Sequence, residues 1–138
     1  MPDRAPLPPE ITQGATSRGN EYGWSISSFP DAMTKAEALG YACSGGQFQF
    51  RSSDAICEMY WLSPGSADRL ASESLADYSK RSCSEVLKGF QHLVAITDFR
   101  KEAAGWPLRI DPIRHLVFVA YFVMETDLAD LAKKIAAL

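Results

Sequence analysis

The sequence has few of the residues from which metal sites and disulfide scaffolds are built. Its 138 residues include three cysteines and two histidines. No Cys-x-x-Cys pair occurs, so no spacing typical of a zinc site can be written. The N-terminus lacks the apolar segment of a secretory signal, and an odd number of cysteines without such a signal predicts free, buried thiols in the reducing cytoplasm. We therefore expect a cytoplasmic location, no metal and no cofactor.

Neither a strong charge of one sign nor a long apolar run is present. The net charge is −3 and the pI is about 5.3, which argues against a dedicated nucleic-acid binder. The longest apolar run spans residues 116–124, about half of the roughly 20 residues that a membrane-spanning helix needs. With 46% apolar and 22% charged residues, the composition is that of one ordinary globular domain. We expect neither nucleic acid nor membrane as a partner.

The first twenty residues differ in composition from the rest of the chain. They are rich in proline, glycine and small polar residues, so we interpret residues 1–20 as a flexible tail and residues 21–138 as a single domain. Residues 22–28 alternate large apolar with small residues, which predicts a strand. Ser28, Pro30 and Asp31 form an N-cap pattern, and apolar residues at helical spacing up to Gly40 predict a short helix.

Residues 46–62 contain two alternating segments, and this pattern predicts a β-hairpin. Pairing Phe48 with Met59 and Phe50 with Cys57 places large apolar side chains on one face, together with Trp61. A shift of one residue would mix the two faces. The opposite, polar face carries Gln47, Gln49, Arg51, Glu58 and Tyr60. The two-residue loop at 53–54 lacks the glycine of a type I′ turn, which leaves a wider loop open.

Residues 67–104 have helical composition, with apolar residues recurring at three- and four-residue spacing. The length predicts two or three helices, with breaks in the serine-rich segment 79–84 and at Thr97 and Asp98. Residues 116–123 fit a helix or a buried strand, and we favour the strand because β-branched and aromatic residues dominate. Thr126 and Asp127 predict the N-cap of a helix over 128–138. The fold class is then α+β: a small antiparallel sheet with a central hairpin, covered on one face by helices.

Few residue patterns point to catalysis. A thiolate nucleophile needs a base nearby, and Cys43 with His92 or His115 is the combination that the sequence offers. Free cysteines more often behave as small buried apolar residues, and we interpret them so. Gly45 and Gly46 have the composition of an anion-binding nest, but a bend or bulge at the start of a strand explains the pair better.

The polar face of the hairpin has two interpretations. Polar side chains on a solvent-facing sheet are ordinary, and this is the simpler one. Tyrosine and arginine are also enriched at binding hot spots, and glutamines on a strand place donors and acceptors at fixed spacing. If helices cover only the other face, a protein partner would bind the polar face through Gln47, Gln49, Arg51, Glu58 and Tyr60.

Part of the chain also resembles a known class of proteins. The segments that carry the resemblance are residues 22–24, 36–41, 45–50 and 57–61. In style they are similar to small immunity proteins of bacteria with polymorphic or contact-dependent toxin systems. The resemblance implies a single-domain, often acidic protein without catalytic residues, which neutralises a cognate toxin by covering its active site. It assigns no binding residue to this chain.

The leading hypothesis is a non-enzymatic protein-binding module, an immunity protein whose partner is a toxin domain. A second, acidic patch on the helical segment would consist of Asp68, Glu73 and Asp77. The alternative is a small ligand-binding domain or enzyme with a pocket between sheet and helices. The residues of such a pocket would be Cys43, His92, His115, Trp24 and Trp61. A third possibility is a structural protein that oligomerises through a sheet edge, and the sequence leaves the oligomeric state open.

Overall fold

The computed structural model describes residues 7–19, 21–124 and 135–138. The helices in this part of the chain are α1 (Pro9–Thr12), α2 (Phe29–Ala38), α3 (Leu75–Ile96) and α4 (Phe99–Ala104). The strands are β1 (Thr16–Arg18), β2 (Glu21–Trp24), β3 (Ala42–Arg51), β4 (Ile56–Met59) and β5 (Leu116–Val123). They form one antiparallel sheet in the order β1-β2-β5-β3-β4, with the last strand in sequence at its centre. The fold is α+β, as predicted.

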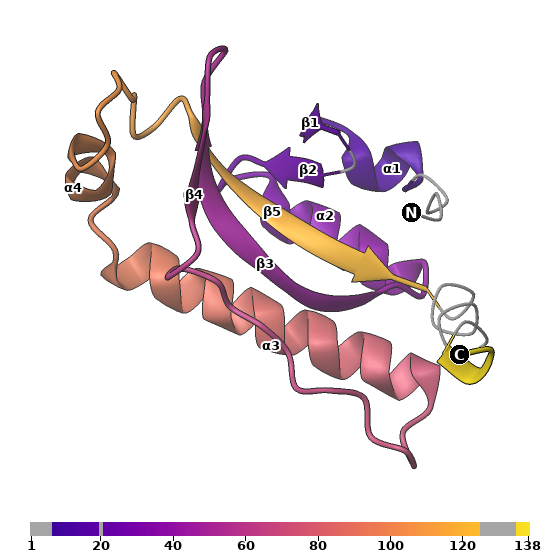
Figure 1. Ribbon diagram of the computed structural model, residues 1–138. Helices are drawn as coiled ribbons and strands as arrows, with labels where there is room; N and C mark the ends of the chain where they lie inside the picture. Colours follow the sequence, from indigo (N-terminus) through magenta and orange to yellow (C-terminus); the bar gives the residue numbers. More distant parts are fainter. Residues whose placement is uncertain (1–6, 20, 125–134) are drawn as a thin grey trace.

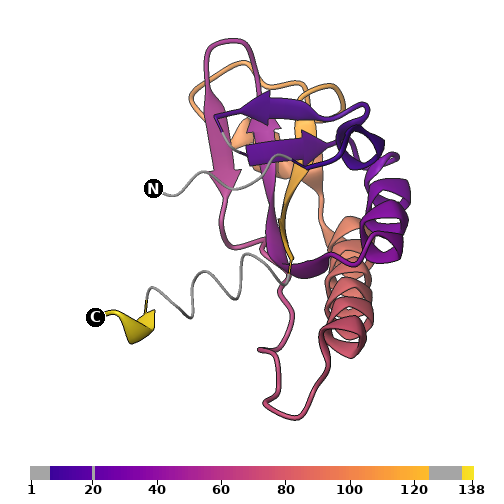
Figure 2. The ribbon, with the colours of Figure 1, turned by 90° about the vertical axis from the view of Figure 1, so that its right-hand side faces the viewer.

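Helices α2 and α3 lie on the same side of the sheet, as Figure 2 shows. Alternate residues of β2, β3, β4 and β5 point to this side and form the core with the helices, whereas all three residues of β1 are exposed. At its centre the Phe118 ring of β5 lies 4.8 Å from that of Phe48, 4.6 Å from Phe29 and 5.0 Å from Phe90. None of the helices in the described ranges is both long and apolar enough to cross a lipid bilayer.

The hairpin has the predicted register. Phe48 pairs with Met59 and Phe50 with Cys57, and all four side chains belong to the buried core. The connecting loop is closed by the amide of Ser52, which donates to the carbonyl of residue 55 at 3.0 Å. The alternation of apolar and polar residues therefore determined both the pairing and the face of each strand.

Trp61 does not share the apolar face, and this part of the prediction is wrong. Strand β4 ends at Met59, where the amide of Leu62 donates to the Met59 carbonyl at 2.8 Å and the chain turns. The turn carries Trp61 out of the sheet, so its side chain is 49% exposed. Leu62 is buried instead and belongs to the core.

Helix α3 runs through the serine-rich segment, so the predicted break at 79–84 is wrong. Its serines bind the neighbouring backbone: Ser79 Oγ donates to the carbonyl of Tyr41 at 2.6 Å, and Ser82 Oγ accepts from the amide of Cys43 at 3.0 Å. These buried hydroxyls are satisfied and attach the helix to β3. The other break is confirmed, because the Asp98 carboxylate caps α4. Residues 67–74, also expected to be helical, form a loop before α3.

Other local predictions are also confirmed. Residues 116–123 are strand β5, and β2 lies where the first strand was expected. Helix α2 is followed by Gly40 with φ of 87°, a left-handed conformation that favours glycine. The register of β3 shifts between Cys43 and Gly45, so the glycine pair begins at a bulge. The Ser28 hydroxyl, however, contacts the Ser25 hydroxyl and makes no cap bond.

The N-terminal segment is more ordered than the sequence suggested. Within residues 1–20, interpreted above as a flexible tail, the chain forms α1 and β1. Ile11 is fully buried, and its carbonyl accepts a hydrogen bond from Trp24 Nε1 at 2.8 Å. Strand β1 pairs with β2 along the edge of the sheet. Residues 9–18 therefore belong to the domain, while the cap predicted at Thr126 and Asp127 lies outside the described residues.

Candidate partner-binding surface

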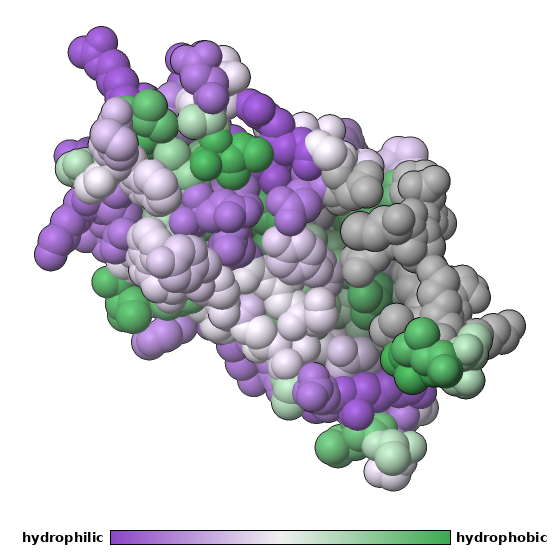
Figure 3. Space-filling model, in the orientation of Figure 1, coloured by the Kyte–Doolittle hydropathy of each residue, from purple (hydrophilic) through white to green (hydrophobic). Residues whose placement is uncertain are grey.

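The face of the sheet that points away from α2 and α3 is the face seen in Figure 1. The space-filling view in the same orientation is mostly hydrophilic to neutral over the strands, with separate hydrophobic spots (Figure 3). The predicted site residues lie along β3 and at β4 on this face, since they alternate with the core residues of both strands. Their surroundings divide them into a buried group and an exposed group.

The buried group, Gln49 and Arg51, forms a row of hydrogen-bonded side chains along β3 together with the half-buried Gln47. Gln49 Nε2 donates to Gln47 Oε1 at 2.8 Å, and Arg51 Nε donates to Gln49 Oε1 at 3.1 Å. Beyond this row, Arg51 Nη1 donates to the carbonyl of Thr16 in β1 at 3.0 Å. Gly23 provides the room, because a Cβ there would lie 3.1 Å from Arg51 Nη1 and 2.9 Å from a methyl group of Val117. The row thus connects the hairpin to the opposite edge of the sheet.

The contact between Arg51 and Thr16 requires a strongly curled sheet. Strands β3 and β1 are separated by β5 and β2, which in a flat sheet would place them about 14 Å apart. A second contact confirms the curl, since Arg18 of β1 donates through Nη2 to the carbonyl of Ser52 just beyond β3. Strand β1 therefore approaches the end of β3 on the side away from the helices.

This curl corrects the expected exposure of two site residues. The side chains of Gln49 and Arg51 are 0% and 7% exposed, although the polar face was expected to meet solvent. Burial lowers the pKa of the Arg51 guanidinium, and the nearby Glu21 carboxylate opposes this effect. Arg51 Nη2 is buried without a hydrogen-bond partner. Gln49 and Arg51 therefore use their polar atoms mainly inside the fold.

The exposed group lies at β4 and the turn that follows it. Glu58 is exposed directly opposite Gln49, and Tyr60 is 72% exposed. The Tyr60 ring packs edge-on against Trp61 with a centroid distance of 5.0 Å. Trp61 in turn stacks on Trp106, which follows α4, at 6.4 Å and an interplanar angle of 18°. We refer to Tyr60, Trp61 and Trp106 as the aromatic patch.

Two members of the aromatic patch were not assigned to the site from the sequence. Trp61 was placed in the core because alternation was extended beyond the end of β4. Trp106 received no role, although a tryptophan between Gly105 and Pro107 lies outside any regular element and is a signal of surface use. Their contact joins segments 45 residues apart, which no local pattern predicts.

The turn that carries Tyr60 and Trp61 is held by three hydrogen bonds. The Leu62 amide donates to the Met59 carbonyl, and the Ser63 hydroxyl donates to the Tyr60 carbonyl at 2.7 Å. The amide of Phe48 in β3 donates to the Leu62 carbonyl at 3.1 Å. The aromatic patch is therefore presented by a fixed backbone, so little freedom of the turn remains to be lost on binding.

The residues of the alternative, enzymatic hypothesis are not placed as it requires. Cys43 is fully buried, its Sγ donates to the Gly45 carbonyl, and burial raises the pKa of its thiol to about 12. His92 is exposed on α3, and His115 Nδ1 accepts from the amide of Asp111 at 3.1 Å. Trp24 lies in the core, away from solvent. A thiol with so high a pKa stays protonated at neutral pH and is a poor nucleophile.

One residue of the predicted acidic patch, Glu73, forms an ion pair within the protein. Both carboxylate oxygens of Glu73 accept from Arg81, at 2.7 and 2.8 Å, and this pair holds the pKa of Glu73 at about 2. Arg81 also donates to the carbonyls of Ala67 and Asp68. The cluster therefore attaches the loop before α3 to that helix. Asp77 is exposed in the first turn of α3.

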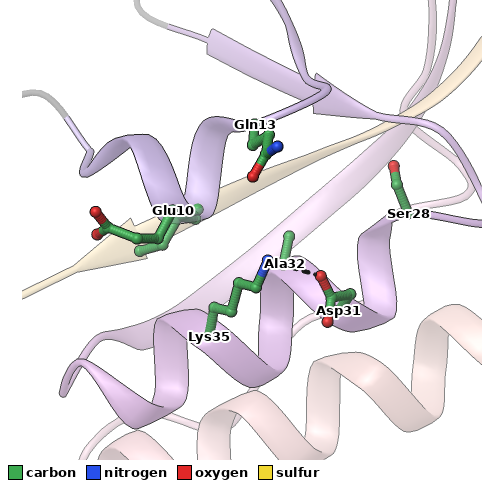
Figure 4. Close-up of a pocket in the computed structure, with 7 residues that line it drawn as sticks. Glu10, Gln13, Ser28, Asp31, Ala32 and Lys35 are labelled. Carbon is green, nitrogen blue, oxygen red and sulfur yellow. Dashed lines mark ion pairs between the residues drawn. The ribbon is translucent and has the colours of Figure 1, made fainter.

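A polar pocket of about 240 Å³ lies between α1 and α2 (Figure 4). Glu10 and Gln13 of the N-terminal segment line one side, and Asp31 and Lys35 line the other. Lys35 Nζ lies 3.0 Å from the Asp31 carboxylate, so the one charge neutralises the other. No cluster of three or more potential metal-binding side chains occurs in residues 7–19, 21–124 and 135–138.

A scan against protein-family models and searches of curated proteins and of solved structures found no match to this chain. The fold and the aromatic patch are therefore the observations from which a function is argued.

Proposed function

We propose that the protein is a non-enzymatic protein-binding module, and specifically an immunity protein that neutralises a cognate bacterial toxin in the cytoplasm. The observation that carries this proposal is the aromatic patch, in which the exposed Tyr60 packs against the exposed Trp61 and Trp61 stacks on the half-buried Trp106. Tyrosine and tryptophan are the residue types most enriched at binding hot spots, together with arginine. Their large rigid side chains bury much area at a small entropic cost.

The polar residues of the hairpin support the patch in two ways. Glu58 is exposed beside the turn, and it supplies a polar contact at the rim of the interface, together with the half-buried Gln47. Gln49 and Arg51 support the surface indirectly, since their hydrogen bonds connect β3 to β1 and stabilise the curled sheet. The binding surface is then the aromatic patch with Glu58 and Gln47 at its edge.

Neutralisation by this surface needs no reactive group in the protein. When a partner binds the aromatic patch, the part of the partner that contacts the patch is covered. If that part contains the active site of a toxin, the toxin can no longer bind its substrate. The binding free energy then comes from a few aromatic side chains surrounded by polar contacts that exclude water.

The proposal is tested by co-expression with the product of the adjacent gene, followed by affinity purification and size-exclusion chromatography. We expect a stable complex, and we expect the adjacent product to be toxic when expressed alone. Y60A and W61A should each weaken the complex by about 30-fold, the effect of losing a hot-spot residue of about 2 kcal/mol. Both side chains are exposed, so neither variant should lose much thermal stability.

A matched control is L70A. Leu70 is 63% exposed and lies in the loop before α3, at the other end of that helix from α4 (Figure 1). The L70A complex should be as tight as that of the unchanged protein. The proposal is lost if the adjacent product neither binds nor is toxic. The assignment of the binding surface is wrong if the Y60A and W61A variants bind the adjacent gene product as tightly as L70A does.

A further inference from the structure

The aromatic patch continues into an open groove between α4 and the segment that leads to β5. The groove has a volume of about 650 Å³, and Trp106 lies at its wall as well as in the patch. Its other large apolar side chains are Leu108, Ile110 and Ile113, of which Leu108 and Ile113 are exposed, Ile113 by 78%. We call this feature the Trp106 groove. Such a concentration of exposed apolar side chains is typical of a binding surface.

The charged side chains around the Trp106 groove are positive in balance. Residues 98–115 carry four basic and three acidic side chains, whereas the whole chain has a net charge of −3. Arg100 and Arg109 line the groove and are exposed. Within the described residues, neither guanidinium has an ion pair or a side-chain hydrogen bond.

Two of the three acidic groups are already bonded to the backbone. Asp98 Oδ1 accepts from the amides of residues 100 and 101 as the cap of α4. Asp111, which also lines the groove, accepts through Oδ1 from the amides of Ile113 and Arg114 at 2.9 and 3.0 Å. These bonds fix both carboxylates in their turns and leave the arginines without intramolecular partners.

We propose that the Trp106 groove binds an acidic segment of the protein partner, in which a large apolar side chain is flanked by carboxylates. The apolar side chain packs between Trp106, Leu108 and Ile113, and the carboxylates accept hydrogen bonds from Arg100 and Arg109. Arginine suits this role because its planar guanidinium forms two parallel bonds with one carboxylate. This inference rests on the proposed protein-binding function and names the chemistry of the partner surface.

The first experiment uses the complex with the adjacent gene product. A charge-reversed variant, R100E/R109E, should bind at least about 100-fold more weakly, about tenfold for each lost charged contact. Affinity of the unchanged protein should fall with rising salt. K80E is the control, because Lys80 is an exposed lysine near the N-terminus of α3. If the complex forms and R100E/R109E binds as K80E does, this inference is wrong while the proposed function stands.

The second experiment tests the groove by itself, so it remains decisive if the adjacent product does not bind. A peptide with leucine between pairs of glutamates is added to ¹⁵N-labelled protein up to about 1 mM. Amide resonances of residues 100–113 should shift, and a peptide with glutamines in place of the glutamates should shift them far less. Absence of shifts, or equal shifts with both peptides, overturns the inference. Equal binding of an RNA oligomer, or a dimer that R100E/R109E abolishes, overturns it as well.

Discussion

Replacing Gly46 by alanine tests how closely the sheet packs at its centre. Gly46 lies in β3 opposite Ala120 of β5. A Cβ at this position would lie 2.3 and 2.5 Å from two ring atoms of Phe118 and 2.6 Å from the carbonyl oxygen of Val119. Carbon atoms in contact are normally at least about 3.5 Å apart, so the added methyl group does not fit unless its neighbours move.

The neighbours of Gly46 have little room to move. Phe118 is fully buried and packs against Phe29, Phe48 and Phe90, so its ring cannot turn away without displacing another ring. Overpacking a core costs about 1–3 kcal/mol, and we expect G46A near 3 kcal/mol because a ring and a backbone carbonyl are both involved. In a domain of this size that loss lowers the Tm by about 10 °C.

Urea unfolding followed by tryptophan fluorescence measures this loss, and a second substitution identifies its cause. F118L removes the ring atoms that the new methyl group would meet, so the double variant should be more stable than the sum of the single losses by about 1–2 kcal/mol. G65A is the control, because a Cβ at Gly65 would meet only the Ser44 carbonyl oxygen at 3.7 Å. The reasoning is refuted if G46A costs no more than G65A, or if G46A and F118L are additive.

Two further predictions concern ionisable groups. The three thiols are buried and burial raises the pKa of Cys43 to about 12, so Ellman's reagent should label the native protein only as it opens; rapid native labelling of any thiol would contradict this. The Arg81 guanidinium holds the pKa of Glu73 at about 2, below its ordinary value of 4.5, so the stability from this pair is present above pH 4.5 and is lost as the pH falls toward 2. E73Q should therefore flatten the acid side of the stability–pH curve, and an unchanged acid side would show that the pair contributes nothing.

The hairpin and β5 could be predicted from the sequence because burial on one face repeats every second residue. That period favoured the pairing of Phe48 with Met59, since a shift of one residue places Glu58 opposite Phe48 and mixes the two faces. For residues 116–123 the abundance of β-branched and aromatic residues gave the correct element. In both cases the information lies within a few neighbouring residues.

The burial of the polar side chains could not be predicted in the same way. Alternation shows which face a side chain occupies, but not whether that face is covered. Gln49 and Arg51 are on the predicted face and are nevertheless buried, since β1 approaches from the far edge of the curled sheet. Ser79 and Ser82 were misjudged for a related reason, because a serine that bonds to a neighbouring strand has the same local sequence as one that ends a helix.

The aromatic patch links binding to the packing of the hairpin against α3. Trp61 follows the edge strand β4, and Trp106 follows α4, which comes directly after α3, so the two rings meet when the hairpin is packed against α3. A partner that binds both tryptophans therefore recognises the hairpin only when it is packed against α3, and its binding stabilises the native state. At a free concentration of 100 times the Kd, this gain is about 2.7 kcal/mol. It should slow hydrogen exchange in α3 and in the hairpin as well as at the surface, because separating the hairpin from α3 would separate the two halves of the binding surface.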